Sequence, residues 1–138
     1  MDKIFVDTDI ILDLLSERHP HYTASANLFS LADIGKVKLY ISPLSFSNLH
    51  YILRKQYSSK ISRQALQRLK TLVQVVPVND KIIELALASD FPDFEDAIQY
   101  YTAVDSNLEI ILTRNLKDYR KASITVMTAG DYLKSIGI

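Results

Sequence analysis

Acidic residues follow or open apolar stretches at three distant points of this chain. Asp7 follows the apolar residues 4–6, Asp93 and Asp96 open a helical pattern, and Asp118 lies shortly after a third apolar run. In an open α/β sheet, ligands bind beyond the carboxyl ends of the strands. If these side chains meet there, they form the oxygen-rich cluster that hard cations such as Mg²⁺ or Mn²⁺ prefer. The pattern therefore predicts metal-assisted phosphoryl chemistry.

These acids do not all need a functional explanation. Asp9 and Asp93 suit the N-caps of helices, where carboxylates are favoured, and Asp13 is expected at the surface. Asp7 is harder to explain, because a carboxylate beside a buried strand is costly unless it is paired or bound to a metal. Asp96 is followed by the pattern of a packed helix and is expected to point toward the crevice. We therefore predict that Asp7 and Asp96 bind the metal, with Asp93 as a further candidate.

Polar residues around the first and fourth strands are candidate supporting groups. Thr8 is either a turn residue or a hydrogen-bond partner of a carboxylate or a metal-bound water. Thr113 and Asn115 follow the fourth strand, and Asn115 also suits the cap of a short helix. Arg114 has the planar fork that holds a phosphate, although a pair with Asp118 is an alternative.

Composition limits the classes of protein that fit. The 138 residues, without cysteine and with zero formal net charge, suit a single domain, 1–138, in a reducing cytoplasm. No apolar run is long enough for a membrane span. Zero net charge argues against coating of nucleic acid by bulk charge, but the stretch 34–79 has no acid and eight bases. Such a segment beside an acidic site suits a metal nuclease, and a solvated basic helix face is the alternative. The bases are Lys36, Lys38, Arg54, Lys55, Lys60, Arg63, Arg68 and Lys70.

Short apolar strands alternate with amphipathic helices along the chain. This alternation predicts an α/β fold with a mostly parallel sheet of four to five short strands and helices on both faces. The strands are expected at 3–6, 38–41, 73–78, 109–112 and 124–126, with Pro77 marking the third as an edge strand or strand end. The N-caps of the later helices are expected at Ser42, Ser62, Asn79, Asp93 and Thr128.

Four stretches of the sequence resemble the motifs of PIN-domain ribonucleases. The opening Ile-Phe-Val-Asp-Thr-Asp-Ile-Ile-Leu-Asp-Leu-Leu at 4–15 is similar to the first motif. Phe-Glu-Asp-Ala-Ile-Gln at 94–99 is similar to the third, and Ile-Leu-Thr-Arg-Asn-Leu-Lys-Asp-Tyr at 111–119 to the fourth. The closing 124–128 also fits, so the resemblance covers the whole chain. Its specificity comes from the order and spacing of these short motifs.

The resemblance implies a fold, an activity and partners. It implies a three-layer α/β/α domain and a Mg²⁺- or Mn²⁺-dependent endoribonuclease that acts on single-stranded segments of structured RNA. Single-domain members include toxins of bacterial type II toxin–antitoxin pairs, so a cognate antitoxin and a homodimer are expected. Asp7 and Asp96 match the first and third acids of the family. The fourth maps between Asn115 and Asp118, of which Asp118 is the charged candidate.

One position departs from the family pattern. The second acid, usually a glutamate early in the third helix, is matched here by Asn48. An asparagine still offers an amide oxygen to a hard cation, but it removes one negative charge and cannot act as a base. Asp93 or Glu95 is the candidate to compensate. A weakened or inactive module that binds RNA or a protein partner is therefore the alternative function.

The expected chemistry is metal-assisted hydrolysis of an RNA phosphodiester. Asp7 and Asp96 hold the cation, Asp118 or Asp93 orients the attacking water, and Arg114 or a central lysine holds the phosphate. A second enzyme class, the haloacid-dehalogenase-type phosphatases, is a weaker alternative. In that case Asp7 would be phosphorylated and Asp9 would be the acid, but later motifs lack counterparts.

Overall fold

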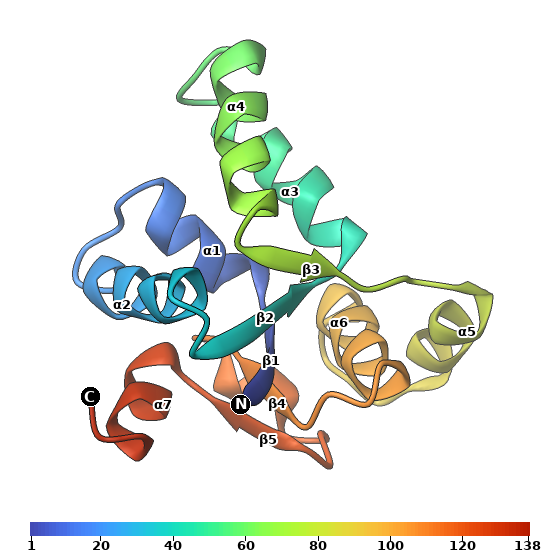
Figure 1. Cartoon of the computed structure of the whole chain (residues 1–138). Helices are drawn as coiled ribbons and strands as arrows, with labels where there is room; N and C mark the ends of the chain where they lie inside the picture. Colours follow the sequence, from blue (N-terminus) through green and yellow to red (C-terminus); the bar gives the residue numbers. More distant parts are fainter.

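The computed structural model describes all residues, 1–138, as five strands, seven α-helices and a short 3₁₀-helix (Figure 1). The elements in chain order are β1 (Asp2–Val6), α1 (Thr8–Leu15), α2 (Tyr22–Asp33), β2 (Val37–Ile41), α3 (Pro43–Leu53), α4 (Ser59–Lys70), β3 (Val73–Val75), α5 (Asp80–Ala88), α6 (Phe94–Asp105), β4 (Ile110–Leu112), η1 (Leu116–Tyr119), β5 (Thr125–Met127) and α7 (Ala129–Ser135). The predicted alternation of strands and helices is confirmed.

The strands form one parallel sheet in the order β3-β2-β1-β4-β5. β1 lies at the centre, where Ile4 is in register with Leu39 of β2 and with Ile110 of β4. This position explains the unbroken apolar run of β1, because a central parallel strand is covered on both faces. β3 is an edge strand that ends at Val75, shortly before Pro77, as expected of a strand that approaches a proline.

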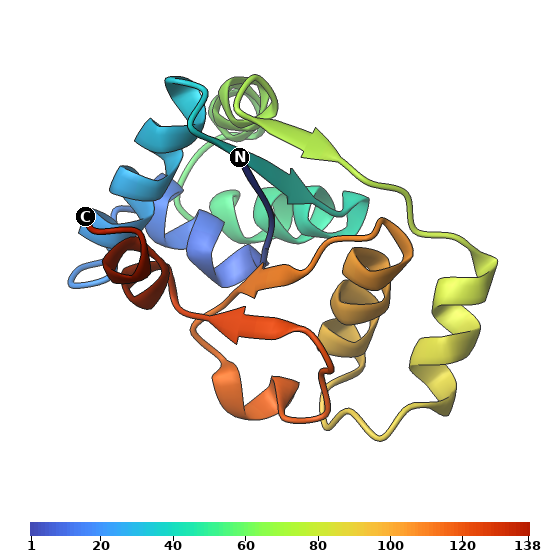
Figure 2. The same cartoon turned by 60° about the horizontal axis from the view of Figure 1, so that its bottom comes forward.

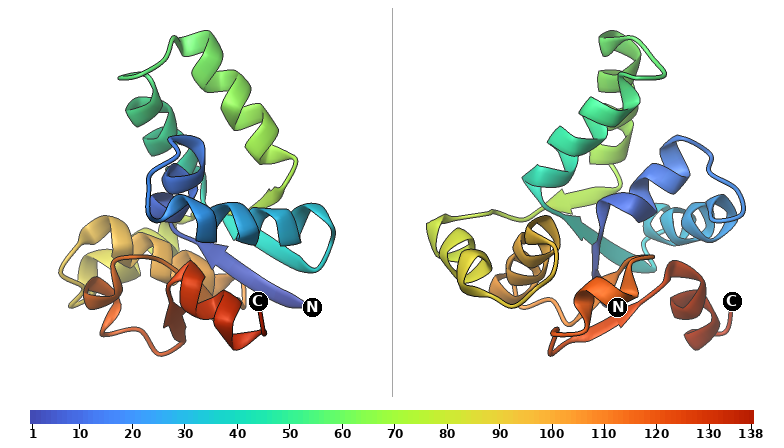
Figure 3. Two further views of the ribbon diagram at one scale, coloured as in Figure 1. Left: turned by 90° about the vertical axis from the view of Figure 1, so that its left-hand side faces the viewer. Right: turned by 180° about the vertical axis from the view of Figure 1, so that it is seen from behind.

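Helices cover both faces of the sheet and give three layers. Ile4 and Val6 belong to a core that includes side chains of α1, α2, α3, α4 and α7, whereas Phe5 faces a second core that includes α6. Figures 1 and 2 show α5 and α6 together on one side, away from α1, α2 and α7. The hairpin of α3 and α4 projects from the rest of the molecule (Figure 3).

Several helix starts were predicted correctly and two were not. Ser42, Asn79, Asp93 and Thr128 are N-caps whose side chains accept a backbone N–H in the first turn. The prediction of Ser62 as a cap is wrong, because Ser58 caps α4 and Ser62 is buried within the helix.

The first helix also begins two residues earlier than expected. The prediction that Asp9 is the cap of α1 is wrong, because Asp7 occupies that position and accepts the Thr8 N–H. The strand therefore leads into the helix without an intervening turn. This start leaves Asp9 in the first turn of α1, where its side chain is available for other contacts.

None of the helices combines the length and the apolar character that a crossing of the membrane requires.

Candidate functional site

Asp7 lies at the carboxyl end of β1 and is almost completely buried. Its Oδ1 accepts the Thr8 N–H at 2.7 Å and the Gln99 amide at 3.5 Å. Its Oδ2 accepts the Thr113 hydroxyl at 2.9 Å and the Tyr119 hydroxyl at 3.2 Å. Burial raises the pKa of Asp7, and the four hydrogen bonds oppose that rise by favouring the carboxylate. The first strand, α6 and the segment after β4 therefore all converge on this one side chain.

Asp96 lies in the first turn of α6, whose cap Asp93 accepts the Asp96 N–H at 3.0 Å. Asp96 accepts the Asn115 amide at 3.2 Å on Oδ2 and the Tyr119 hydroxyl at 3.4 Å on Oδ1. The Tyr119 hydroxyl is thus in contact with both Asp7 and Asp96, which are 89 positions apart in the sequence. Burial and then repulsion from Asp7 and other nearby acids raise the pKa of Asp96 to about 8.

Asp9, which was expected as an N-cap and not as a metal ligand, is a further member of the cluster. Its Oδ2 accepts the Arg114 N–H at 3.0 Å and the Thr113 hydroxyl at 3.4 Å. Its Oδ1 is buried and has no hydrogen-bond partner. Burial, followed by repulsion from Asp7, raises the pKa of Asp9 to about 6. A buried carboxylate oxygen without a donor is costly, so this atom is a candidate ligand for a cation.

These acids line one cleft of about 230 Å³ at the carboxyl edge of the sheet. Its walls are Asp7, Thr8, Asp9, Leu12, Arg18, Ile52, Asp93, Glu95, Asp96 and Asn115. No three acids or histidines already surround a single point at metal-ligand spacing. Mg²⁺ suits such a site, since it is commonly held by one or two carboxylates and keeps several of its waters. Carboxylates whose pKa is raised by burial and by mutual repulsion also favour a cation between them.

Asn48, which replaces the expected second acid, has a direct acidic partner. Its amide donates to Glu95 Oε1 at 2.7 Å, so α3 and the start of α6 are joined at the cleft. Glu95 lines the cleft and Asn48 does not. Burial and the neighbouring Asp93 raise the pKa of Glu95. Glu95 thus contributes a carboxylate to the cleft, and Asn48 orients it.

Replacing Asn48 by aspartate is expected to destabilise the metal-free protein. The Asn48→Asp variant would place two carboxylates at hydrogen-bond distance, so one would be protonated or both displaced. We expect the melting temperature in EDTA to fall by a few degrees at pH 8 and by less at low pH, where a shared proton restores the contact. Thermal melts over a pH series measure this, with the Asn48→Gln variant as the uncharged control. A variant as stable as wild type at every pH would contradict the contact.

The segment after β4 carries the polar groups of the predicted fourth motif. Asn115 lines the cleft and donates its amide to both Asp96 and Asp118. Asp118 does not line the cleft but is close enough to raise the pKa of Asp96. Asn115 stands at the N-cap of η1, as expected, but its side chain makes no capping hydrogen bond and serves the two acids instead. Asn115 is therefore the member that reaches the cleft, and Asp118 acts through it.

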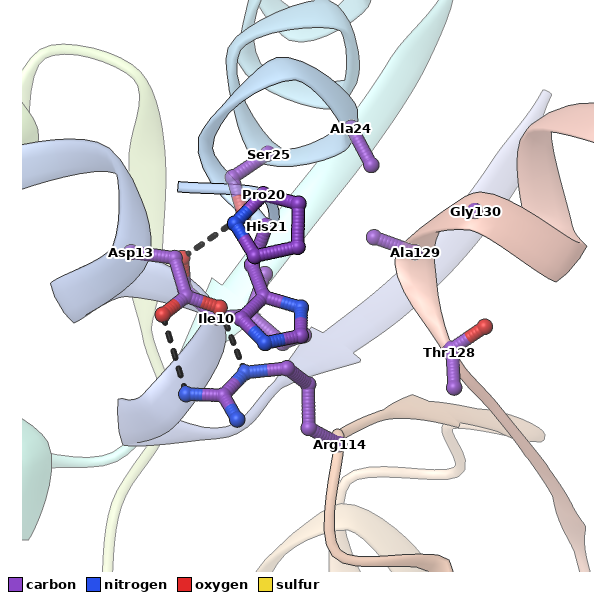
Figure 4. Close-up of a pocket in the computed structure, with 10 residues that line it drawn as sticks. All are labelled: Ile10, Asp13, Pro20, His21, Ala24, Ser25, Arg114, Thr128, Ala129 and Gly130. Atoms are coloured by element: carbon purple, nitrogen blue, oxygen red, sulfur yellow. Dashed lines mark hydrogen bonds and ion pairs between the residues drawn. The ribbon is translucent and has the colours of Figure 1, made fainter. Parts of the chain in front are cut away.

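The Arg114 side chain, which was predicted to hold a phosphate, is paired with an acid in the structure. Its guanidinium forms a bidentate pair with Asp13, through Nε at 2.7 Å and Nη2 at 3.0 Å (Figure 4). Asp13 is completely buried, so its expected surface position is wrong. The alternative pairing of Arg114 with Asp118 is also not formed, because Asp118 bonds to Asn115. The pair borders a neighbouring pocket of about 350 Å³, outside the acidic cleft.

A buried row of hydrogen-bonded polar side chains leads to Asp7 and supports the acidic cluster. Ser42 donates to Gln99 at 2.6 Å, Gln99 donates to Ser45 at 2.9 Å, and Ser45 shares a hydrogen bond with Thr8 at 2.9 Å. Gln99 also reaches Asp7. Tyr119 and Gln99 were quoted only as parts of motifs, although a glutamine on the apolar side of a helix was a usable signal. The row fixes the orientation of Asp7 without exposing it.

Comparison with known proteins places this arrangement in a family. Residues 3–117 match the PIN domain family. The chain is 24% identical over 136 residues to ribonuclease VapC1 of Aquifex aeolicus (strain VF5), an alignment that covers 95% of this chain and 93% of that protein. The fold is similar to a toxin-antitoxin complex from Klebsiella pneumoniae, with a TM-score of 0.69, 23% identity and coverage of 91% and 97% of the two chains. It is also similar to VapC20 of Mycobacterium tuberculosis, a sarcin-ricin loop cleaving toxin, with a TM-score of 0.67, 18% identity and coverage of 85% and 95%.

The family match and the converging acids agree with one another. The match spans β1, β4 and the start of α6, the elements that bring Asp7, Asp96 and Asn115 together. The family match also argues against the phosphatase alternative, in which Asp7 would be the nucleophile. The chain therefore belongs to the PIN-domain family.

Proposed function

We propose that this chain is a metal-dependent endoribonuclease and the toxin of a toxin–antitoxin pair. The observation that carries the proposal is the convergence of Asp7 and Asp96 on the Tyr119 hydroxyl, inside a cleft lined by further carboxylates. The ribonuclease name of the Aquifex aeolicus relative and the toxin–antitoxin descriptions of the structural relatives support it. An acidic cleft repels a phosphodiester unless a cation intervenes, so the proposal needs a metal.

The donor set fits Mg²⁺ or Mn²⁺. Asp7 and Asp96 would hold the ion directly or through waters, with Asp93 and the unpartnered Oδ1 of Asp9 as further oxygen donors. When bound, such an ion supplies an activated water and neutralises charge on the scissile phosphate. The four hydrogen bonds to Asp7 keep its carboxylate in one orientation for this purpose.

The remaining polar residues position the reactants. The Asn115 amide donates a hydrogen bond to Asp96 and so orients it, and Asp118 accepts a second hydrogen bond from the same amide. Asn48 turns Glu95 toward the cleft, where its raised pKa suits a group that accepts a proton from an attacking water. Thr8 holds the start of α1 through its hydrogen bond with Ser45, and Thr113 donates directly to Asp7. In this arrangement Glu95 takes the place of the missing second acid, so Asn48 is compatible with catalysis.

The proposed partners follow from the same charges. RNA is the substrate, and a cognate antitoxin inhibits by placing a basic side chain against the cleft acids. A homodimer is the proposed assembly, in keeping with the family resemblance. The alternative is an inactive module that binds RNA or a protein partner, and the absence of an acid at position 48 is the observation that favours it.

Cleavage of structured RNAs tests the proposal. The purified chain, free of antitoxin, is incubated with a mixed panel of structured RNAs and Mn²⁺, Mg²⁺ or EDTA. We expect cuts with either metal, none with EDTA, and none with Asp7→Asn. Glu84→Gln, which changes an exposed carboxylate on α5, is the matched control and is expected to cut normally. Folded wild-type protein that cuts no RNA with any metal would leave the binding module as the better explanation.

Metal binding is also expected to change how stability depends on pH. Because the native pKa of Asp96 is about 8 and that of Asp9 about 6, the folded state binds more protons than the unfolded chain between about pH 4 and pH 8. The metal-free protein therefore loses stability as pH rises through this window. Mg²⁺ or Mn²⁺ binds the deprotonated acids, so the rise in melting temperature that metal causes is expected to be larger at pH 8 than at pH 6. Equal rises at both pH values, or none, would contradict the cation site.

A further inference from the structure

A basic and aromatic stripe leads away from the acidic cleft along α3. Asn48 contacts Glu95 at the cleft, and Ile52, one turn later, lines the cleft wall. Tyr51 lies on α3, three residues beyond Asn48, and Lys55 lies in the turn that follows the helix, where its side chain packs over the Tyr51 ring. Arg54, between them, caps the end of α3. The stripe therefore begins on the helix that reaches the cleft and continues into the turn after it.

The stripe is open to solvent and its cations lack acidic partners. Ser47, His50, Tyr51, Arg54 and Lys55 line a shallow hollow on the α3–α4 hairpin, the part that projects from the molecule in Figures 1 and 3. The Tyr51 side chain is 68% exposed, with the Lys55 ammonium 4.9 Å from its ring centroid. The pair of Asp13 and Arg114 is the one ion pair of the whole structure, so Arg54 and Lys55 are free to meet another anion.

We propose that Tyr51, Arg54 and Lys55 form a second RNA-contact site that holds the substrate strand beyond the cleft. Arg54 and Lys55 bind backbone phosphates, and Tyr51 stacks on a base, which is the combination used for single-stranded nucleic acid. The helical rise of about 1.5 Å per residue places Arg54, the residue that caps α3, about 9 Å from Asn48 along the helix axis. A stacked strand advances about 3.4 Å per nucleotide, so the contact lies about three nucleotides from the scissile phosphate.

The position of the stripe suits a nuclease, because such an enzyme must bind a negatively charged RNA backbone next to a cleft lined by carboxylates. The cleft carries Asp7, Asp9, Asp93, Glu95 and Asp96, whereas the run from 34 to 79 has no acid at all. A bound cation accounts for one phosphate at the cleft, and the neighbouring phosphates of the same strand need separate cationic contacts. The stripe supplies cations at the end of the helix whose Asn48 and Ile52 reach the cleft. The inference rests on the proposed ribonuclease activity for one point, the distance between this contact site and the scissile phosphate. The binding of RNA itself is tested separately.

Binding is measured first, with wild-type protein and a fluorescent single-stranded RNA in EDTA, over a series of salt concentrations. We expect the Arg54→Gln/Lys55→Gln double variant to bind about tenfold more weakly, with a salt slope reduced by about 1.4, as for two lost contacts to a single strand. Tyr51→Leu is expected to weaken binding about tenfold without changing the slope, and Tyr51→Phe to retain it. Lys81→Gln/Lys134→Gln is the matched control, because both lysines are exposed, neither lines the cleft or the hollow, and neither belongs to the basic segment 34–79.

Cleavage kinetics with metal then separate this inference from the proposed function. We expect the double variant to raise KM with kcat unchanged, because the contact does not touch the reacting atoms. If wild type cuts no RNA while the stripe variants lose RNA binding, the endoribonuclease proposal fails and the second contact site stands. If wild type cuts RNA while the stripe variants bind and cut like the lysine control, the second contact site is overturned and the endoribonuclease stands.

Discussion

Replacing Asp96 by asparagine is expected to abolish RNA cleavage and, at the same time, to stabilise the metal-free protein. Activity is expected to fall by at least about a hundredfold, because a cation ligand lost at the reacting phosphate costs about 3 kcal/mol or more of transition-state stabilisation. Stability is expected to rise because Asp96 is a carboxylate whose pKa is raised to about 8 by burial and by repulsion from Asp7 and other acids. At pH 8 the amide removes that repulsion while keeping the shape of the side chain.

The two effects separate a metal-binding role from a structural one. The native pKa of Asp96 lies above that of the unfolded chain, so its stabilising contribution is present at low pH and is lost as pH rises toward 8. The melting temperature of Asp96→Asn in EDTA should therefore exceed that of wild type by a few degrees at pH 8, and the difference should shrink toward pH 4. Glu84→Gln, an equal change of charge at an exposed site, is the control for both measurements. A loss of activity accompanied by a lower melting temperature would point to misfolding instead.

The sheet and the meeting of the main acids could be predicted because they depend on local patterns. Apolar runs such as 4–6 and 110–112 are buried on both faces, and parallel strands bring their carboxyl ends to one edge. Asp7 directly follows the first of these runs, and Asp96 begins the helix that leads into β4, so that helix starts at the same edge. The meeting of Asp7 and Asp96 at this edge therefore follows from the alternation of elements, whereas the order of the strands does not.

The contacts that complete the site depend on pairings that no local pattern encodes. Asp13 is 101 positions from Arg114, and Asn48 is 47 positions from Glu95. Helical spacing alone puts Asp13 one turn beyond Asp9 and suggests solvent, but the segment after β4 covers it. Whether such a residue is buried is decided by which loop packs over the helix. The same holds for Tyr119, whose hydroxyl reaches the acids only because η1 folds back beneath the cleft.

The pairing of Asn48 with Glu95 changes the meaning of the departure from the family pattern. Position 48 considered alone has lost a negative charge and a possible metal ligand. In the structure the cleft still carries a carboxylate beside α3. It belongs to Glu95 of α6, which the Asn48 amide holds at the cleft. The charge is therefore supplied by α6 instead of α3. An active enzyme is consistent with this arrangement, and the Asn48→Asp melts test the contact on which it depends.

The largest expected effect on stability is that of Arg114→Ala. The Asp13 side chain is completely buried and has a bidentate bond to the Arg114 guanidinium, so removal of the arginine leaves a buried charge without its partner. Breaking a buried pair from one side costs roughly 3 kcal/mol, which corresponds to a fall of about 10 °C in melting temperature for a domain of this size. Denaturant unfolding at neutral pH measures the free energy directly.

The control and the double variant decide between the two roles considered for this arginine. Arg120→Ala, at an exposed arginine without an ion pair, is expected to change the free energy of unfolding by less than about 0.5 kcal/mol. Asp13→Asn combined with Arg114→Gln is expected to recover part of the loss, because two neutral amides leave no buried charge. If Arg114→Ala instead raised KM for RNA while the free energy of unfolding stayed unchanged, the arginine would hold substrate phosphate and the Asp13 pair would be dispensable. A loss of stability that the double variant repairs would assign Arg114 to anchoring the segment after β4 on α1, which keeps Asn115 and the Arg114 N–H in place against Asp96 and Asp9.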